Sequence, residues 1–145
     1  MQQEIIIDNN VEQYKLTTDE FVYAQADGNY TRIHLTHPEA DKSDKDGGSV
    51  TVMMQMGQLI RLIDRQLVNT QSTLARLGNS YIINLDYVFH IKPAARRLTL
   101  RDWSGRTYQL DRMPLNPLKQ LKALLLQRAG GASAETAGED DTKEQ

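Results

Sequence analysis

Short segments rich in apolar residues recur along the chain, as is typical of β-strands. In residues 30–35 they alternate with the period of two of a half-buried strand, since Thr31, Ile33 and Leu35 fall on one face and larger polar or aromatic side chains fall on the other. Residues that favour turns separate these segments. The pattern predicts strands at residues 4–8, 13–16, 21–26, 30–35, 50–54, 87–92, 98–101 and 106–110.

Two segments instead repeat their apolar residues every three or four positions, which predicts amphipathic helices. The first helix is expected at residues 57–68. The second is expected to start with Asn116 as its N-cap and Pro117 in the first helical position, and to end at Gly130-Gly131. The apolar faces consist of Leu59, Ile60, Ile63 and Leu67 in the first helix and of Leu118, Leu121 and Leu125 in the second.

These elements together predict a mostly β fold with antiparallel sheets and two short helices. Residues 36–49 and 132–145 hold almost no large apolar side chains, so we expect a mobile hairpin loop in the first segment and disorder in the second. The predicted core consists of Phe21, Tyr23, Ile33, Leu59, Ile63, Leu67, Ile82, Ile91, Leu98, Leu100, Leu110, Leu121 and Leu125.

The stretch from Leu74 to Leu85 places a polar turn, Gly78-Asn79-Ser80, between two apolar segments. Gly78 can adopt positive φ without strain and Asn79 tolerates it, while the Tyr-Ile-Ile run that follows favours a strand. The turn would hold polar side chains at the end of a strand, where they could bind a ligand. An ordinary structural turn is an equally good interpretation.

The composition narrows the class of protein. A chain of 145 residues with 39% hydrophobic and 25% charged residues is typical of one soluble globular domain. It has no apolar run long enough for a membrane helix and no secretory signal at its start, so we expect a cytoplasmic protein. Because cysteine is absent, disulfides, thiolate metal sites and a cysteine nucleophile are excluded.

The net charge of −2 hides a strong asymmetry along the chain. Residues 1–75 hold 11 acids and 6 bases, a net charge of −5, and residues 129–145 hold 5 acids and one lysine, a net charge of −4. Between them, residues 76–128 hold 10 bases and 3 acids, a net charge of +7. A basic block of this kind is typical of a surface that binds a polyanion. Solvated strand faces in a mixed-charge protein are the alternative.

Catalysis is not expected from this sequence. The three histidines, His34, His37 and His90, show neither metal-ligand spacing nor a paired nucleophile, and no glycine-rich phosphate loop or paired-carboxylate motif is present. We therefore expect no enzyme activity, no cofactor and no metal.

Several of these segments resemble the LytTR DNA-binding domains of bacterial transcriptional regulators. The likeness begins at residues 21–35, continues through residues 57–67 and 76–88, and ends with residues 98–100, 108–112 and 118–125. Its most specific part is the Arg-x-x-x-Ser-x-x-x-Asn pattern of Arg76, Ser80 and Asn84. The resemblance implies a LytTR-like domain at residues 14–128, after an N-terminal extension or strand at residues 1–13 and before a disordered acidic tail at residues 129–145.

In that family, loops at one edge of the fold insert into successive DNA grooves, without a recognition helix. Here the resemblance implies three contacting segments, which are residues 29–32, the turn at residues 78–80 and the loop at residues 111–112. The chain departs from the family pattern at Leu74, where an aromatic residue is usual, at Gly78, where histidine is frequent, and at Asp111, where a small polar residue is usual. The predicted DNA-binding residues are Asn29, Tyr30, Thr31, Arg32, Arg76, Gly78, Asn79, Ser80 and Arg112.

Individual side chains suit different kinds of contact. Arg112 could grip a guanine edge or a phosphate in two-point fashion, or pair with its neighbour Asp111. Asn79 could bond an adenine edge or a phosphate, or stabilise its own turn. Arg76 could contact a phosphate or bridge to Asp86.

Other residues suit supporting roles. Arg32 could reach the backbone of a duplex, and Ser80 is expected to bond the backbone of its turn. Asn84 is expected to be structural. Three further arginines are expected to be solvated or to make peripheral phosphate contacts, and these are Arg96, Arg97 and Arg101.

The sequence thus predicts a DNA-binding regulator of transcription, of the kind found in bacterial response regulators, which reads the major groove of double-stranded DNA with loop side chains. A second copy on an adjacent DNA repeat is left open, and a membrane partner is not expected. The alternative is a non-catalytic β-domain that binds a protein partner. In that alternative the acidic tail would mimic DNA and cover the basic face as an autoinhibitory segment.

Overall fold

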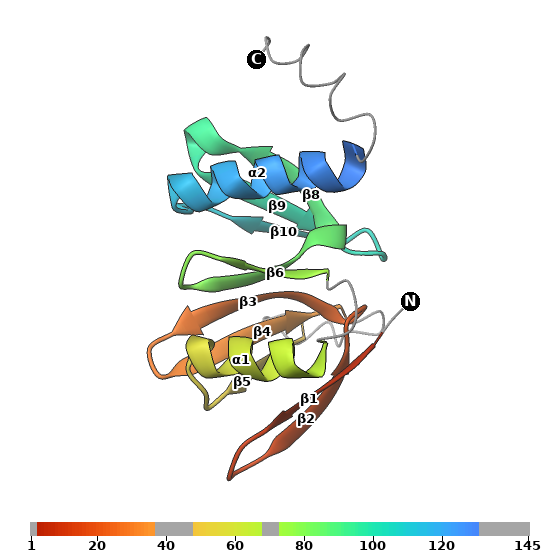
Figure 1. The fold of residues 1–145 in the computed structure, drawn as a ribbon, viewed down its shortest axis with the longest axis vertical. Helices are drawn as coiled ribbons and strands as arrows, with labels where there is room; N and C mark the ends of the chain where they lie inside the picture. Colours follow the sequence, from red (N-terminus) through yellow and green to blue (C-terminus); the bar gives the residue numbers. More distant parts are fainter. Residues whose placement is uncertain (1–2, 37–47, 68–72, 131–145) are drawn as a thin grey trace.

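The computed structural model describes residues 3–36, 48–67 and 73–130. Within these ranges the chain forms ten β-strands, two α-helices and two 3-10 turns. The prediction of a mostly β fold with antiparallel sheets and two helices is confirmed (Figure 1). The elements are β1 Glu4–Asp8, β2 Gln13–Thr17, β3 Phe21–Asp27, β4 Tyr30–Leu35, β5 Ser49–Val52, α1 Met56–Gln66, β6 Leu74–Leu77, β7 Tyr81–Asn84, η1 Leu85–Tyr87, β8 Val88–Lys92, η2 Pro93–Ala95, β9 Arg97–Arg101, β10 Thr107–Leu110 and α2 Leu115–Gly130.

A five-stranded antiparallel sheet with the order β5-β4-β3-β7-β6 forms the middle layer. Its central strand β3 buries four consecutive residues, from Phe21 to Ala24. The pairing of β3 with β4 shifts between Phe21 and Tyr23, so this bulge turns both Val22 and Tyr23 to one side of the sheet while Phe21 and Ala24 face the other. The sheet is therefore covered on both faces, which explains the unbroken apolar run in β3.

The lower core in Figure 1 lies between the central sheet, helix α1 and the β1–β2 hairpin. Ile5 and Ile7 of β1 are fully buried there against Phe21, and the apolar stripe of α1 supplies Leu59 and Ile63. The spacing of the α1 stripe is what the three- and four-residue repeat predicted. Strand β1 pairs with β2 along its whole length in a separate two-stranded sheet, and the burial of Ile5 and Ile7 in the lower core joins this hairpin to the central sheet.

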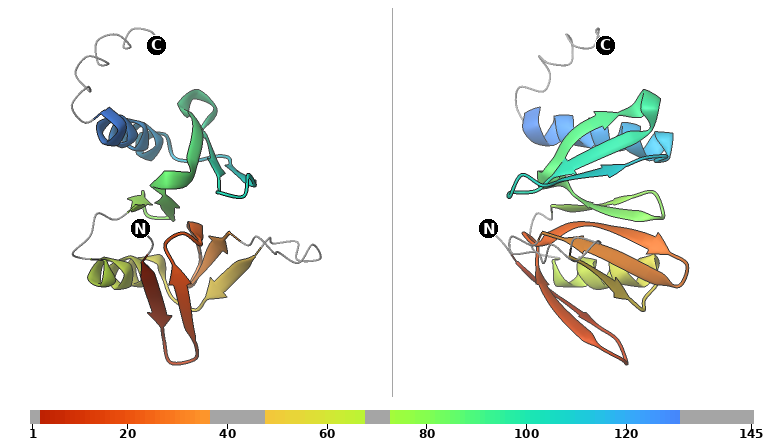
Figure 2. Two further views of the ribbon diagram at one scale, coloured as in Figure 1. Left: turned by 90° about the vertical axis from the view of Figure 1, so that its right-hand side faces the viewer. Right: turned by 180° about the vertical axis from the view of Figure 1, so that it is seen from behind.

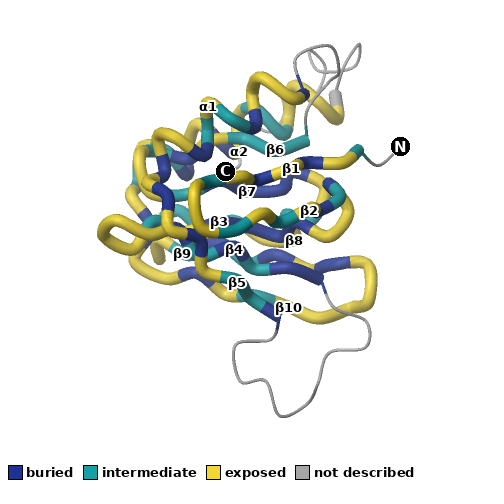
Figure 3. Tube along the Cα trace, turned by 90° about the horizontal axis from the view of Figure 1, so that it is seen from below, coloured by how far each residue is buried: buried dark blue, intermediate teal, exposed yellow. Residues whose placement is uncertain are grey.

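The upper core lies between the opposite face of the central sheet, the three-stranded sheet β10-β9-β8 and helix α2. Figure 2 shows α2 and the three-stranded sheet side by side above the central sheet. Leu98 and Leu100 of β9 point inward with Met113 and Leu118, and all four are fully buried. In Figure 3 the buried residues run through the strands while the turns at the sheet edges are exposed.

Asn84 ties the ends of several elements together. Its Nδ2 donates hydrogen bonds to the carbonyl oxygens of Thr18 (3.1 Å) and Phe21 (2.8 Å), and its Oδ1 accepts one from the Asp86 backbone N–H at 2.9 Å. The side chain is buried and satisfies backbone groups that water cannot reach. The prediction that Asn84 is structural is confirmed.

Some boundaries differ from the predictions. Strand β5 starts one residue earlier than expected and ends at Val52 rather than at residue 54. The prediction that Asn116 caps α2 is wrong, because the helix starts at Leu115 and its first hydrogen bond runs from Leu118 N–H to the Pro114 carbonyl. Pro117 then lies within the first turn, where its missing N–H costs nothing.

Of the 13 residues predicted for the core, all except Ile91 and Leu125 are buried. The observed core also contains fully buried residues that the predicted list omits, and these include Ile5, Ile7, Val22, Val52, Ile83, Met113 and Leu118. The predicted mobile loop lies mostly outside the described residues. Of the predicted disordered tail, residues 129 and 130 belong to α2, and the rest lies outside the described residues. Within the described ranges, no helix is both long and apolar enough to cross a bilayer.

Burial of tyrosine hydroxyls makes the stability of this fold sensitive to alkaline pH. Burial raises the pKa of Tyr23 from 10.0 to about 12, and burial with the nearby carboxylate of Asp19 raises the pKa of Tyr87 to about 12. Burial and a hydrogen bond to Asp102 also raise the pKa of Tyr108. The folded state thus favours neutral tyrosine, and this contribution is complete below pH 10 and is lost as pH rises toward 12.

The free energy of unfolding, measured by chemical denaturation, should therefore fall between pH 10 and about 12. The variant Tyr87→Phe should be less stable at neutral pH, because it loses the 2.6 Å hydrogen bond to the Asp19 carbonyl, and it should show a shallower alkaline fall. Stability that stays constant across this pH window would contradict the assignment.

Candidate nucleic-acid interface

Three connections from separate parts of the chain meet at one edge of the fold, at the left of Figure 1. We call this surface the turn edge; it comprises residues 27–30 between β3 and β4, residues 78–80 between β6 and β7, and residues 111–114 between β10 and α2. The backbone N–H of Ala26 donates to the Ser80 carbonyl at 2.8 Å, which fixes the second connection beside the first. A Cβ atom at Gly78 would lie 3.4 Å from Pro117 Cγ and 3.9 Å from Pro114 Cγ, so the second connection also contacts the third.

The β6–β7 turn is held in place by Arg76. Gly78 adopts a φ of +65°, which glycine tolerates without strain. Arg76 Nε donates to the Gly78 carbonyl at 2.9 Å, and Arg76 Nη2 donates to Asn79 Oδ1 at 2.7 Å. The suggested bridge from Arg76 to Asp86 is wrong, because Asp86 pairs with Arg128 at 3.4 Å instead. Arg76 therefore orients the exposed side chain of Asn79.

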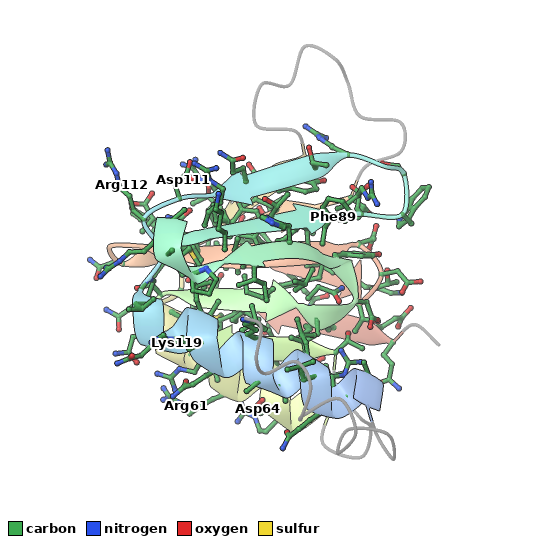
Figure 4. The ribbon with its side chains drawn as sticks, turned by 90° about the horizontal axis from the view of Figure 1, so that it is seen from above. Arg61, Asp64, Phe89, Asp111, Arg112 and Lys119 are labelled. Atoms are coloured by element: carbon green, nitrogen blue, oxygen red, sulfur yellow. The ribbon has the colours of Figure 1, made fainter. Side chains whose placement is uncertain are left out.

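Arg112 lies in the third connection and projects from the molecule (Figure 4). Its φ of +59° is in the left-handed region, which costs a non-glycine residue about 1–2 kcal/mol. The neighbouring Asp111 is bonded elsewhere, since Arg97 Nε donates to one carboxylate oxygen at 2.8 Å and Gln109 donates to the other at 3.3 Å. These hydrogen bonds, that of Arg97 first, lower the pKa of Asp111.

The alternative in which Arg112 pairs with Asp111 is thus not found. In the part of the chain that the structure describes, the Arg112 guanidinium has no hydrogen-bond or ion-pair partner. All of its N–H donors remain available to a ligand. A phosphate or the edge of a guanine can accept two parallel hydrogen bonds from such a guanidinium.

The β3–β4 connection divides into exposed and buried residues. Asn29 is exposed at the turn that Gly28 forms with a φ of +66°, and its Oδ1 accepts a hydrogen bond from Gln55 Nε2 at 3.1 Å. Tyr30 is also exposed. Thr31 is fully buried and donates to the Met54 carbonyl at 2.7 Å, so its side chain supports the sheet and is not open to a surface ligand.

Two more of the predicted residues border this edge. Arg32 is half-buried on β4, and its Nη2 lies 3.9 Å from the Asp27 carboxylate. Ser80 binds the backbone of β3 through its carbonyl, and its hydroxyl is exposed. The predicted hydrogen bond from the Ser80 side chain to the backbone of its turn is not found among the described residues.

Both helices start at the turn edge (Figure 1). The first turns of α1 and α2 contain no acidic residue, and the N-cap of α1, Gln55, makes no side-chain capping hydrogen bond. A helix N-terminus carries unpaired N–H groups and about half a positive charge, which favour an anion. The backbone thus adds positive potential at the edge where Arg112 and Asn79 lie.

The predicted site missed two cations that border the turn edge. Figure 4 shows Arg61 of α1 and Lys119 of α2 on the same side of the molecule as Arg112. The terminal amine of Arg61 lies 3.9 Å from where a Cβ of Gly57 would be, so this side chain folds back toward the start of α1. The sequence marks both residues only as polar positions on helices, and only the placement of the helix starts brings them to this edge.

The described residues show few features of a metal site or a catalytic site. They contain no cluster of three histidine, aspartate or glutamate residues that could hold a metal ion. A shallow cavity of about 160 Å³ separates α1 from β6 and β7, and it is lined by Ile60, Ile63, Asp64, Leu74, Arg76 and Ile82. Its lining pairs apolar side chains with one carboxylate and one guanidinium, without a nucleophile.

The left-handed backbone at residue 112 can be tested by stability alone. Glycine relieves the strain that alanine retains, so Arg112→Gly should be more stable than Arg112→Ala by about 1 kcal/mol in urea unfolding. Gln109, exposed within β10, is the matched control, because in a strand the glycine variant should be the less stable of the two. The same order at both positions would contradict the assigned conformation.

Comparison with known proteins gives a likeness of overall fold. No family model matches the sequence, and no curated protein matches it significantly. Among solved structures, the chain is similar to a LytTr DNA-binding domain from Bacillus cereus, with a TM-score of 0.49 and 12% identity, over 84% of this chain and 95% of that chain. That domain carries the name of the family that the sequence motifs resemble. At this identity and TM-score, the likeness assigns neither a function nor contact residues to this chain.

Proposed function

We propose that this protein binds double-stranded DNA through the turn edge and regulates transcription by recognising a specific sequence. The observation that carries the proposal is the meeting of three exposed connections at one edge, where Arg112 has no carboxylate partner and Asn79 is held by Arg76. The resemblance of the sequence motifs to LytTR domains supports the same function independently of this geometry.

In the proposed complex, the positive groups around the turn edge contact phosphates and fix the position of the duplex. These groups are the two helix N-termini together with Arg32, Arg61 and Lys119. Contacts of this kind do not depend on sequence, and each one releases counterions from the DNA. The affinity should therefore fall steeply as the salt concentration rises.

Asn79 and Arg112 are the proposed readers of base edges in the major groove. One lone pair of Asn79 Oδ1 is already bonded to Arg76, which leaves the amide group to donate and the second lone pair to accept. This matches the donor and acceptor on the edge of adenine. The open fork of Arg112 matches the two acceptors of guanine. Arg76 acts as a positioning residue, because its bonds to the turn set the direction of Asn79.

Selection from a pool of random duplexes at moderate salt tests this proposal. The wild-type protein should enrich one motif. Arg112→Ala should weaken binding to that motif by about 1–3 kcal/mol, or roughly 5- to 150-fold, and blur one position in it. Asn79→Ala should blur a different position.

Matched controls remove the same groups outside the three connections of the turn edge. Arg65→Ala acts at the last turn of α1, and Asn10→Ala acts in the turn between β1 and β2; both should leave the motif and the affinity unchanged. No enrichment by the wild type, or equal weakening by Arg65→Ala and Arg112→Ala, would contradict the proposal.

Asp111 gives a second test, because it places a negative charge within the proposed interface. Asp111→Ser removes this charge and releases Arg97 from its 2.8 Å ion pair. Duplex affinity should then increase several-fold, and the slope of log affinity against log salt should steepen by about one phosphate contact. Asp64→Ser, which removes the same charge from the last turn of α1, is the control. An unchanged or weaker affinity for Asp111→Ser would place the DNA elsewhere.

A further inference from the structure

Helix α2 presents a row of cations that starts at the turn edge. Lys119 and Lys122 are exposed and three residues apart, so they are neighbours on the helix surface. Arg112 lies just before the helix and is also exposed. We call these three residues the cationic ridge. The remaining cation of α2, Arg128, is paired with Asp86 at 3.4 Å and is not included.

No acid compensates this ridge along the chain. The sequence from residue 112 to residue 134 contains no aspartate or glutamate, and neither lysine has an ion-pair partner among the described residues. Five acids then follow between Glu135 and Glu144, with three of them consecutive at residues 139–141. The acids therefore come directly after the helix whose exposed surface is positive.

The chain length after α2 matches the length of the helix. Sixteen residues of α-helix span about 24 Å. Residues 139–141 follow the end of α2 at Gly130 by 9 to 11 residues, and such a length spans at most about 30–40 Å. The three consecutive acids are thus within reach of Lys122, Lys119 and Arg112, which lie toward the start of α2.

We infer that the cationic ridge binds the acidic segment at residues 135–144 of the same chain, and that this segment competes with DNA for Arg112 and Lys119. The inference rests on the proposed function for its consequence, but the contact itself does not require DNA. Covalent linkage gives the acidic segment a millimolar effective concentration at the ridge, which offsets the weakness of each exposed ion pair. Duplex DNA has a higher charge density and displaces the segment where its bases match the turn edge.

The test uses the full-length chain with three acids neutralised, Glu139→Gln, Asp140→Asn and Asp141→Asn. The matched control neutralises three acids in the predicted loop at residues 36–49, Asp41→Asn, Asp44→Asn and Asp46→Asn, so that both variants have the same net charge. Without DNA and at low salt, the first variant should change the amide NMR shifts of Arg112, Lys119 and Lys122, and the control should not.

Duplex affinity provides the second measurement. The variant at residues 139–141 should bind the duplex about 3- to 10-fold more tightly than the control variant, and high salt should abolish the difference. In a background that carries Lys119→Gln and Lys122→Gln, the same three neutralisations should have a much smaller effect on affinity.

The two measurements distinguish failure of the proposed function from failure of the inference. Shift changes at the ridge without duplex binding by any variant would overturn the proposed function and support the intramolecular contact. Equal duplex binding by the two charge-matched variants, or shift changes on β8 and β9 instead of α2, would overturn the inference and leave the proposed function standing.

Discussion

Both faces of the five-stranded sheet are covered, and this constraint decides where a binding site can lie. The β1–β2 hairpin and α1 bury one face, and α2 with the three-stranded sheet buries the other. Buried strand side chains, such as Phe21 and Ile83, pack in the cores, and the burial of each contributes about 1.5–3 kcal/mol. The ends of the strands remain for recognition. The bulge in β3 contributes to this arrangement, because it places consecutive residues of one strand in both cores.

The turn edge concentrates the unusual backbone and charge of the molecule. Gly78 and Arg112 both have positive φ there, and the two helices direct uncapped or acid-free first turns to it. The strain at Arg112 is maintained by Met113, which is buried in the upper core and whose backbone N–H bonds the Arg96 carbonyl at 3.0 Å. The core thus holds an arginine in a conformation that it would not adopt alone, with its guanidinium in solvent.

Periodicity predicted most of the strands and both helices, because the two-residue and three- to four-residue repeats follow directly from which face is buried. Glycine and asparagine at residues 78 and 79 predicted the central turn for a similar local reason. The start of α2 was harder to predict. Asparagine followed by proline is a strong local start signal, but the first helical hydrogen bond runs from the Leu118 N–H to the Pro114 carbonyl.

The candidate site was only partly predictable, because its geometry depends on tertiary contacts. Thr31 and Tyr30 are neighbours in sequence, yet only Tyr30 is exposed, and the bond from Thr31 to Met54 joins distant parts of the chain. The pairing of Asp111 with Arg97 follows from the register of β9 with β10, which the sequence does not specify. Left-handed backbone at an arginine has no sequence signal comparable to glycine.

The most direct test of the account is to map the backbone amides that shift when the enriched duplex is titrated into the full-length protein. The account predicts that the largest shifts occur together at residues 27–30, 78–80 and 111–114 and in the first turns of α1 and α2, with little change in the β1–β2 hairpin or the β9–β10 turn. Largest shifts at the β9–β10 turn, on the opposite edge of the fold in Figure 1, would contradict it.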